Sequence, residues 1–548
     1  MKKSVFAIAA VVLSAALLTA GCNDKTEAGA SSSASAKPDA SKVTPGGELT
    51  WALAGTITND SLDAHKAGFA PTTRVMRNLY DSLVVELPDH TFKPWLATSW
   101  ELSEDKKSYT FHLRKDVKFH DGTPFNAEAV KFNFDRIKDP ATKASSSLNE
   151  IGPYESTEII DEYTVRIHFK TPFAPFLSNA AKVDLGFVSP TAVRKYGDAY
   201  PQNPVGTGPF KLSKLTPSTQ VEFVKNPDYN WAPETAGHQG TAYLDKLTVK
   251  YVDEEATRVS VLQSKQVQVA DIIPPQNLVA LKADKNFNVQ ETELLQANFN
   301  LYLNQQKEPW NNVKAREAFR SALDIDSAVK TIYLGTSKQG WSPISPQQFA
   351  YTPTLENTYK PDVDKANQTL DSLGWVKGSD GYRTKDGKRL TVELIDTQGN
   401  REKRLDLISI FIQQLKKVGI ELKIVSLPSG TYSERRLKGE YELVAGSQFS
   451  GDPDVLRQLF STKGPSGVNN IARANDPQLD AWLEEGYLVT DPGKRKEIYK
   501  KVQEYIIQNV YAIPTYVFQY SVASVKEVKG ITFDSPAWPV FYDAWIQK

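Results

Sequence analysis

The chain of 548 residues contains a single cysteine, Cys22, and this limits how the protein can be held together. One cysteine can form neither an intramolecular disulfide nor a cysteine-ligated zinc site. The body must therefore be stabilised by burial of apolar side chains, for which its 40% hydrophobic content is sufficient. At roughly 150 residues per domain, we expect three to four domains or subdomains.

The charges are balanced, with 65 lysines and arginines against 65 aspartates and glutamates. Nucleic-acid binding proteins use a basic surface to neutralise phosphates, and peripheral membrane proteins use basic segments to hold anionic lipids. The composition supplies neither, so we expect no nucleic-acid partner and no electrostatic attachment to a membrane.

The N-terminal segment has the features of an export signal. Lys2 and Lys3 precede an apolar stretch of 14 residues, Val5 to Leu18, which is shorter than the roughly 20 residues of a membrane-spanning helix. The stretch ends in Leu17-Leu18-Thr19-Ala20-Gly21-Cys22 and resembles a bacterial lipobox. We therefore expect residues 1–21 to be a signal peptide and Cys22 to be lipidated. The alternative is an ordinary secretory signal beside a chance cysteine.

Residues 22–45 are rich in Ser, Ala and Lys and carry almost no large apolar side chain, so we expect a flexible tether. No later segment approaches 18 consecutive apolar residues. The prediction is a large body on the outer side of a membrane, attached to it by lipid at Cys22.

The body alternates between strand and helix patterns. Residues 48–53, 109–113 and 164–169 alternate between apolar and polar side chains, as half-buried strands do. Apolar residues recur at helical spacing from Leu405 to Leu415, with Gly419 as the C-terminal stop and a strand over 420–425. Residues 362–374 have the pattern of another capped helix. This alternation predicts α/β lobes.

Several motifs of the body match one family of proteins. The most specific run lies between residues 94 and 127 and contains Pro94-Trp95-Leu96-Ala97-Thr98-Ser99-Trp100 and Val117-Lys118-Phe119-His120-Asp121-Gly122-Thr123-Pro124-Phe125-Asn126-Ala127. Further matches are Asn78-Leu79-Tyr80-Asp81-Ser82-Leu83, Gly206-Thr207-Gly208-Pro209-Phe210 and Asn226-Pro227-Asp228-Tyr229. Together they resemble the family of large substrate-binding lipoproteins that serve ATP-driven importers of peptides, nickel and related solutes. We expect most motif residues to be structural, since Asp121-Gly122-Thr123-Pro124 is typical of a tight turn.

The resemblance implies a two-lobed, hinged α/β fold of the periplasmic-binding-protein type, with an extra inserted subdomain. Lobe I would comprise residues 46–84, 201–290 and 515–548, the extra subdomain residues 85–200, and lobe II residues 291–514. The resemblance further implies a monomer without cofactor that captures a solute between the lobes and is recognised by the importer's permease subunits.

The resemblance also locates candidate ligand contacts. In peptide-binding relatives, one loop carries an aspartate that pairs with the peptide's amino group, and counting back from Gly451-Asp452-Pro453-Asp454 places that position at Phe449. Asp452 is the alternative carboxylate, although it could equally form a turn with Asx hydrogen bonds. The arginine that holds the peptide's carboxylate is matched by Gln398, with Arg401 three residues later. Both charged anchors of a dipeptide are thus replaced.

Three aromatic residues are further candidates for the ligand site: Trp51 in the first strand, Tyr432 before the Asp452 loop, and Trp538 near the C-terminus. Packing in a core is the competing interpretation of each. The histidines are residues 65, 90, 112, 120, 168 and 238, so lobe II has none, and we expect no bare metal site.

The solute class stays open at this point. A peptide-type solute is favoured because most of the resembling family carries peptides, and a neutral glycoside, an opine-like conjugate or a nickel chelate is the alternative. A hydrolase is a different class, but the chain has no Gly-x-Ser-x-Gly, His-Glu-x-x-His or Gly-x-x-x-x-Gly-Lys motif. A glycosidase could work with two carboxylates, and Asp452 and Asp454 are such a pair, but they lie two residues apart in a Pro-containing turn. A structural or adhesive lipoprotein is the remaining alternative. We expect a binding protein and no catalysis.

Overall fold

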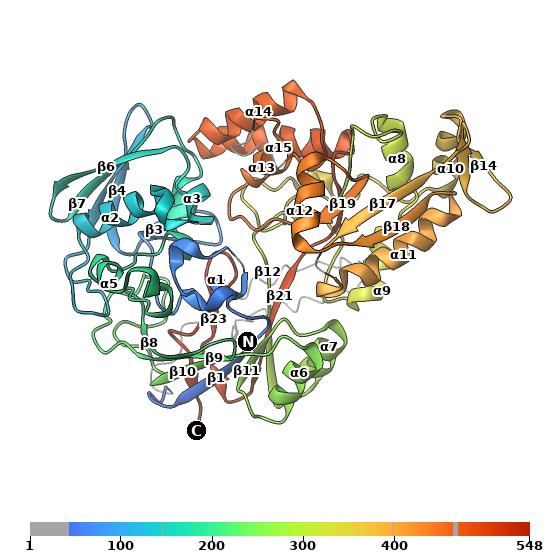
Figure 1. The fold of residues 1–548 in the computed structure, drawn as a ribbon. Helices are drawn as coiled ribbons and strands as arrows, with labels where there is room; N and C mark the ends of the chain where they lie inside the picture. The colour runs from blue at the N-terminus through green and yellow to red at the C-terminus, as the bar shows by residue number, and fades with distance from the viewer. Residues whose placement is uncertain (1–42, 69, 145, 398, 464–469) are drawn as a thin grey trace, which may run out of the picture. The chain divides into compact units, whose positions relative to one another are not determined.

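The structure is a computed structural model that describes residues 43–548, except residues 69, 145, 398 and 464–469 (Figure 1). The signal segment, Cys22 and Gln398 therefore lie outside the described residues. All described residues belong to one compact unit. None of the helices in this part of the chain has the length and apolar character needed to cross a bilayer.

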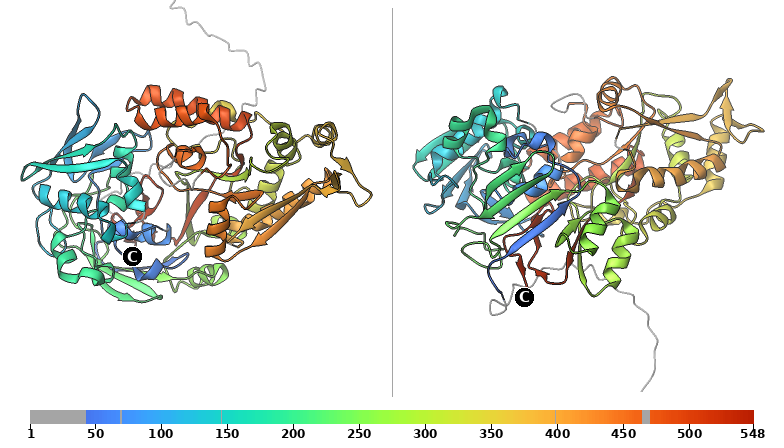
Figure 2. Two further views of the ribbon diagram at one scale, coloured as in Figure 1. Left: turned by 45° about the horizontal axis from the view of Figure 1, so that its top comes forward. Right: turned by 60° about the horizontal axis from the view of Figure 1, so that its bottom comes forward.

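A seven-stranded sheet joins segments from both ends of the chain (Figures 1 and 2). In spatial order its strands are β12 (Phe287–Glu293), β21 (Gln519–Val525), β11 (Val269–Asp271), β1 (Glu48–Leu53), β10 (Lys246–Tyr251), β9 (Gln220–Lys225) and β8 (Phe210–Thr216). Strand β1 runs parallel to its neighbours β10 and β11, while the other pairs are antiparallel. The associated helices are α1 (Ala70–Met76), α6 (Glu255–Gln263) and α7 (Pro275–Ala283).

A four-stranded antiparallel sheet lies between β1 and β8 in the sequence. Its strands, in spatial order, are β4 (Ala97–Leu102), β5 (Ser108–Leu113), β7 (Thr164–Phe169) and β6 (Tyr154–Asp161). The same segment contains the hairpin of β2 (Val84–Glu86) with β3 (Phe92–Pro94), and the helices α2 (Ala127–Lys138), α3 (Ser146–Glu150), α4 (Phe176–Ala180) and α5 (Pro190–Tyr196). One apolar core continues from this segment into the seven-stranded sheet, so the two are packed as one body.

A five-stranded sheet forms the centre of the remaining segment. Its order is β18 (Glu421–Ser426), β17 (Thr391–Asp396), β19 (Leu443–Gly446), β13 (Phe299–Leu303) and β20 (Ile513–Tyr516). Alternate strand residues point to opposite faces of the sheet. On the face of Leu394, the core is shared with the helices α8 (Val313–Ser321), α9 (Ile325–Tyr333), α10 (Val363–Ser372) and α11 (Arg404–Lys417). On the face of Ile395, it is shared with α13 (Val455–Phe460), α14 (Pro477–Leu488) and α15 (Pro492–Gln508). Helix α12 (Ser429–Lys438) follows β18.

The smaller strands form ribbons outside these sheets. They are β14 (Val376–Lys377), β15 (Arg383–Lys385) and β16 (Lys388–Arg389) in one ribbon, β22 (Val528–Lys529) with β25 (Trp545–Ile546), and β23 (Thr532–Phe533) with β24 (Pro539–Val540).

Two short segments connect the seven-stranded and five-stranded sheets. Strands β12 and β21 pair as far as Glu293 and Gln519. The first connection, residues 294–298, leads from β12 to β13, and the second, residues 517–518, leads from β20 to β21. The two connections meet where the Leu294 N–H donates to the Phe518 carbonyl at 3.3 Å. The five-stranded part is therefore an insertion carried on a paired two-segment connection, which is the arrangement that a hinge requires.

The structure confirms the strands and helices expected from periodicity. Residues 48–53 form β1, and the expected strands at 109–113, 164–169 and 420–425 appear as β5, β7 and β18. The Asp362 carboxylate caps α10 by accepting from Lys365 N, and Gly419, with φ +82°, follows the end of α11. The division of the chain into lobe I, the extra subdomain and lobe II, with its residue boundaries, stays a prediction.

The motif residues have the structural role expected of them. Asp121 Oδ1 accepts from Thr123 N at 3.0 Å, which makes the predicted turn, and its Oδ2 accepts from Ser189 Oγ at 2.6 Å. Burial lowers the pKa of His120 to about 4, and its Nε2 lies 3.0 Å from the Gly208 carbonyl oxygen. These residues tie the four-stranded segment to the strand that follows it.

Candidate functional site

Most of the candidate ligand contacts in the five-stranded part lie at one edge of its sheet, where the parallel strands have their carboxyl ends. Strands β18, β17 and β19 are parallel neighbours, and Arg401, Tyr432 and Phe449 follow the ends of β17, β18 and β19, respectively. Ligands of open α/β sheets bind outside the carboxyl ends of their strands. The sheet topology therefore supports this edge as a binding surface.

The structure brings Phe449 and Trp538 together. Phe449 belongs to the loop after β19 of the five-stranded part, and Trp538 lies between β23 and β24 near the C-terminus. Their rings stack with centroids 5.1 Å apart and planes 24° apart. Phe449 is partly buried, Trp538 is almost fully buried, and Trp538 N donates to Asp534 Oδ1 at 2.8 Å. Two candidates from opposite sides of the hinge thus form one aromatic contact.

Trp51 lies inside the seven-stranded sheet. Its side chain is fully buried, and its ring centroid is 5.2 Å from that of Phe541. This is the packing role that the sequence left open for it. Its indole nitrogen, however, has no hydrogen-bond partner among the described residues.

Arg401 and Tyr432 differ in their surroundings. The Arg401 side chain is 56% exposed and pairs with Glu402 at 3.1 Å, so it is available to a solute only through a flexible surface contact. Tyr432 is partly buried in the first turns of α12, and burial raises the pKa of its hydroxyl. Tyr432 is therefore the better placed of the two to offer a fixed polar group.

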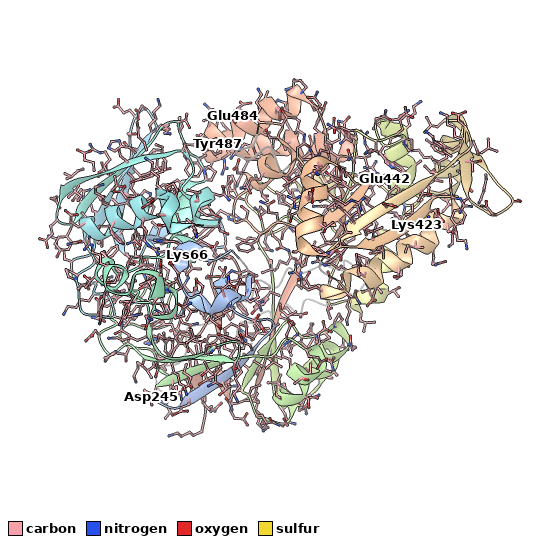
Figure 3. The ribbon with its side chains drawn as sticks, viewed as in Figure 1. Lys66, Asp245, Lys423, Glu442, Glu484 and Tyr487 are labelled. Carbon is pink, nitrogen blue, oxygen red and sulfur yellow. The ribbon has the colours of Figure 1, made fainter. Side chains whose placement is uncertain are left out.

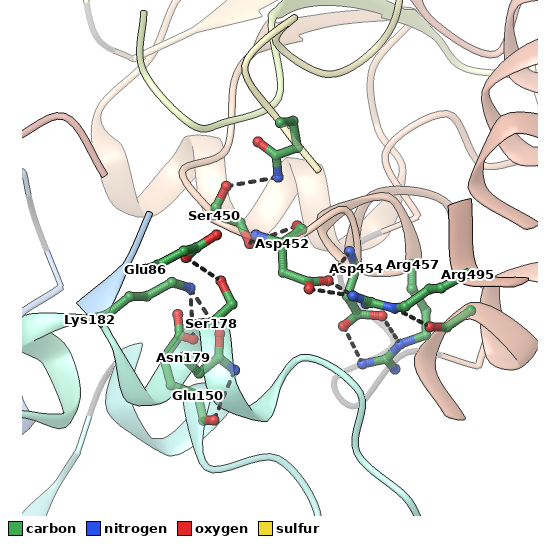
Figure 4. Close-up of polar contacts among 12 residues, drawn as sticks. Glu86, Glu150, Ser178, Asn179, Lys182, Ser450, Asp452, Asp454, Arg457 and Arg495 are labelled. Carbon is green, nitrogen blue, oxygen red and sulfur yellow. Dashed lines mark hydrogen bonds and ion pairs between the residues drawn. The ribbon is translucent and has the colours of Figure 1, made fainter. Parts of the chain in front are cut away.

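Asp452 is fully engaged by an arginine (Figure 4). Arg495 of α15 donates to its two oxygens at 2.5 and 2.6 Å, and both side chains are buried. Asp452 Oδ1 also accepts from Asp454 N at 2.8 Å, which is the Asx hydrogen bond of the competing interpretation. The neighbouring Asp454 is held by Arg457 at 2.7 and 2.9 Å, while burial raises the pKa of Asp454 to about 6.

The same loop also contacts the four-stranded segment. A Cβ atom added at Gly451 would lie 3.2 Å from Ser178 Oγ and 3.3 Å from Lys182 Cε, so only glycine fits at this distance without a shift. Lys182 is buried and donates to Glu150 at 2.9 Å and to Asn179 Oδ1 at 3.0 Å (Figure 4). The loop is therefore confined by both other parts of the molecule.

A second contact lies further along the same boundary. Tyr487 of α14, labelled in Figure 3, has its ring 5.4 Å from that of Phe173, and its carbonyl accepts from Ala174 N at 3.1 Å. The hairpin of β2 and β3 adds His90, whose Nε2 lies 2.9 Å from the Gln347 carbonyl oxygen. The four-stranded segment thus contacts the five-stranded part at separate points.

Sequence reasoning missed a buried ion pair next to Trp538. Arg74 of α1 donates to Asp271 at the carboxyl end of β11, and Asp271 also accepts from Tyr520 Oη at 2.7 Å. The Arg74 guanidinium lies 6.0 Å from the centre of the Trp538 ring. No local signal could have found this group, because its members lie in three separate segments of the chain.

Other possible sites are less convincing. A hollow of about 590 Å³ lies at the edge of the four-stranded sheet, and its lining includes none of the candidate residues. In the part of the chain that the structure describes, no three His, Cys, Asp or Glu side chains gather as a possible metal-ligand set. The aromatic contact and its surroundings remain the best candidate site.

Comparison with known proteins agrees with this fold. The family of bacterial extracellular solute-binding proteins, family 5 (middle region), matches residues 91–470, and the chain belongs to this family. The glutathione-binding protein GsiB of Shigella flexneri is 29% identical over 502 residues, which cover 89% of this chain and 92% of that protein. The family is one of extracellular solute-binding proteins, and this relative is named for binding glutathione.

Two solved structures are similar over nearly their whole length. The periplasmic binding protein DppA of Helicobacter pylori, in complex with the peptide STSA, has a TM-score of 0.76 and 27% identity and covers 93% of this chain and 99% of its own. NikA of Brucella suis, in complex with Fe(III)-EDTA, has a TM-score of 0.80 and 25% identity, with coverage of 91% and 100%. The predicted two-lobed periplasmic-binding-protein fold is therefore confirmed.

Proposed function

We propose that this protein is the extracytoplasmic receptor of an ATP-binding-cassette importer. It captures a peptide-type small solute between the parts that carry Phe449 and Trp538 and delivers it to the permease subunits. The observation that carries the proposal is the stacking of these two rings across the paired connection of residues 294–298 and 517–518. Opening at the connection parts the rings, and closure brings both onto the solute.

The relatives support a peptide-type solute, since one binds glutathione and another was solved with a peptide. Among the candidate ligand contacts, aromatic surface for the solute comes from Phe449, Trp538 and Tyr432. Polar groups come from Arg401 and Gln398, which follow β17 in the sequence. Trp51 supports the site from beneath, and Asp452 shapes the loop through Arg495. Asp452 and Asp454, the carboxylate pair considered for hydrolysis, are both bound by arginines, which argues against a hydrolase that uses this pair.

Thermal unfolding of the mature chain with a panel of solutes tests this function. The panel contains di-, tri- and longer peptides, glutathione, an oligosaccharide, an opine-like conjugate and nickel with histidine. Ligand at 100 times its Kd stabilises a protein by about 2.7 kcal/mol, so a bound solute should raise Tm by a few degrees. A rise in Tm with only the oligosaccharide, the opine-like conjugate or nickel with histidine would show that the solute is not a peptide. A Tm unchanged by every solute of the panel would contradict the receptor function.

We further propose that Cys22 carries the lipid that holds the receptor at the membrane, as a monomer. Cys22→Ala should move the protein from the membrane fraction to the soluble fraction and abolish incorporation of radiolabelled palmitate. Cys22→Ser serves as a second variant of similar size. Unchanged membrane association of both variants would show that the attachment does not depend on this cysteine.

A further inference from the structure

The contacts of Phe449 indicate which chemical group this end of the site can accept. Phe449 stacks on Trp538 and forms a backbone bridge with Gln296. Trp538 and Gln296 are both more than nine-tenths buried. Within the described ranges, neither Trp538 Nε1 nor Gln296 Nε2 has a hydrogen-bond partner. Both atoms carry N–H donors, so a solute group that satisfies them must accept hydrogen bonds.

One unpaired acceptor lies beside the same loop. Gln348 Nε2 donates to the Ser450 carbonyl at 3.0 Å, while the buried Gln348 Oε1 has no partner among the residues that the structure describes. Because this oxygen belongs to a neutral amide, it can accept from an amide N–H but offers no charge to a cation. Two N–H donors and a neutral acceptor next to the same loop are the groups that an amide can satisfy.

Most carboxylates of this region are already paired with an arginine or lysine, including Asp534 with Arg77 and Glu293 with Lys338, while Glu86 is held by Ser178 and His90. Asp452 is held by Arg495 and Asp454 by Arg457, each through two hydrogen bonds. Asp271 is held by Arg74 and by Tyr520 Oη, and both of these partners lie next to the Trp538 ring. An ammonium group that entered beside Phe449 would lose its water and would find Asp452, Asp454 and Asp271 already bound by arginines, which is unfavourable.

We propose that the Phe449–Trp538 end of the site accepts an uncharged, carbonyl-containing group of the solute and discriminates against a free ammonium group. An acylated or otherwise blocked amino end of a peptide is the matching chemistry. Its carbonyl accepts from Trp538 Nε1 and Gln296 Nε2, and the aromatic rings cover its apolar part. This proposal rests on the proposed receptor function and adds the chemical class of the solute.

The test compares pairs of peptides that are identical except for acetylation of the amino end. Isothermal titration calorimetry with the mature chain should give a Kd at least tenfold lower for the acetylated member of each pair. Equal affinities, or tighter binding of the free amine, would overturn this inference and leave the receptor function standing. If no peptide of either form binds, both the receptor function for peptides and this inference fail.

Two variants test the residues involved. Trp538→Phe keeps the stacked ring but removes the N–H, so it should weaken the acetylated peptide about tenfold and change the free peptide little. Phe449→Asp adds an unpaired carboxylate and should reverse the preference. Trp482→Phe on α14, where Trp482 packs on Tyr505, is the matched control and should change neither Kd. Unfolding without ligand verifies that each variant is folded, and an unchanged preference in Trp538→Phe would contradict the proposed role of the N–H.

Discussion

Replacing Arg495 by methionine should lower the free energy of unfolding by about 3–5 kcal/mol, because it leaves the carboxylate of Asp452 buried without its partner. Both oxygens of Asp452 accept from Arg495, and neither side chain is exposed by more than 6%. Urea unfolding followed by circular dichroism measures the change. The same slope with a lower midpoint would show a loss of stability rather than a change of the unfolded state.

Two control variants distinguish the free-energy cost of an unpaired charge from the cost of losing the packing of the arginine side chain. Lys496→Met, on the exposed side of the same helix, should change stability by no more than about 0.5 kcal/mol. Asp452→Asn combined with Arg495→Met removes both charges and should recover most of the loss. If the double variant were as unstable as the single one, the cost would come from packing and not from an unpaired charge.

Replacing Asp184 by asparagine should stabilise the protein at pH 8 by about 4 kcal/mol and have little effect at pH 4. Burial and the nearby carboxylate of Glu150 raise the pKa of Asp184 to about 7 in the folded protein, well above the value of about 3.9 in an unfolded chain. The folded state therefore holds this proton more tightly. Its stabilising effect is fully present below about pH 4 and is lost as the pH rises towards 7.

Urea unfolding of both proteins between pH 4 and pH 8 measures this effect. The difference in unfolding free energy should grow with pH up to about 7 and then stay constant. Asp198→Asn, at an exposed position, is the matched control and should stay within about 0.5 kcal/mol of the parent at each pH. A difference between Asp184→Asn and the parent that did not vary with pH would contradict the assignment to this proton.

Most strands and helices could be predicted from the sequence, because the hydrophobic periodicity that indicates them is a local property of the chain. The alternation over residues 48–53 and the helical spacing from Leu405 to Leu415 each reflect one buried face, and the structure has β1 and α11 at these places. The exposure of Arg401 and the burial of Trp51 were not accessible in this way. Both depend on which other segments cover the side chain.

The candidate site shows the same division. Phe449, Trp538 and Asp452 are candidates that the sequence supplies, but the sequence could not show that the first two stack or that Arg495, 43 residues after Asp452, neutralises it. Arg457 was more accessible, since it lies three residues after Asp454 at helical spacing. The partner of Asp452, in contrast, comes from the distant helix α15 and hence from packing.

By itself, the sequence determined the class of this protein. Its periodicity specified α/β parts and its motifs specified the solute-binding family. That the charged anchors of a dipeptide are replaced at Phe449 and Gln398 stays a prediction from the resemblance. Only the tertiary structure decided the surroundings of Phe449: a stacked Trp538 whose indole N–H has no partner among the described residues, and Asp452 bound by Arg495 in the same loop. The reason is that a residue's type follows from the chain alone, whereas the free or paired state of a buried polar group depends on segments brought together by folding.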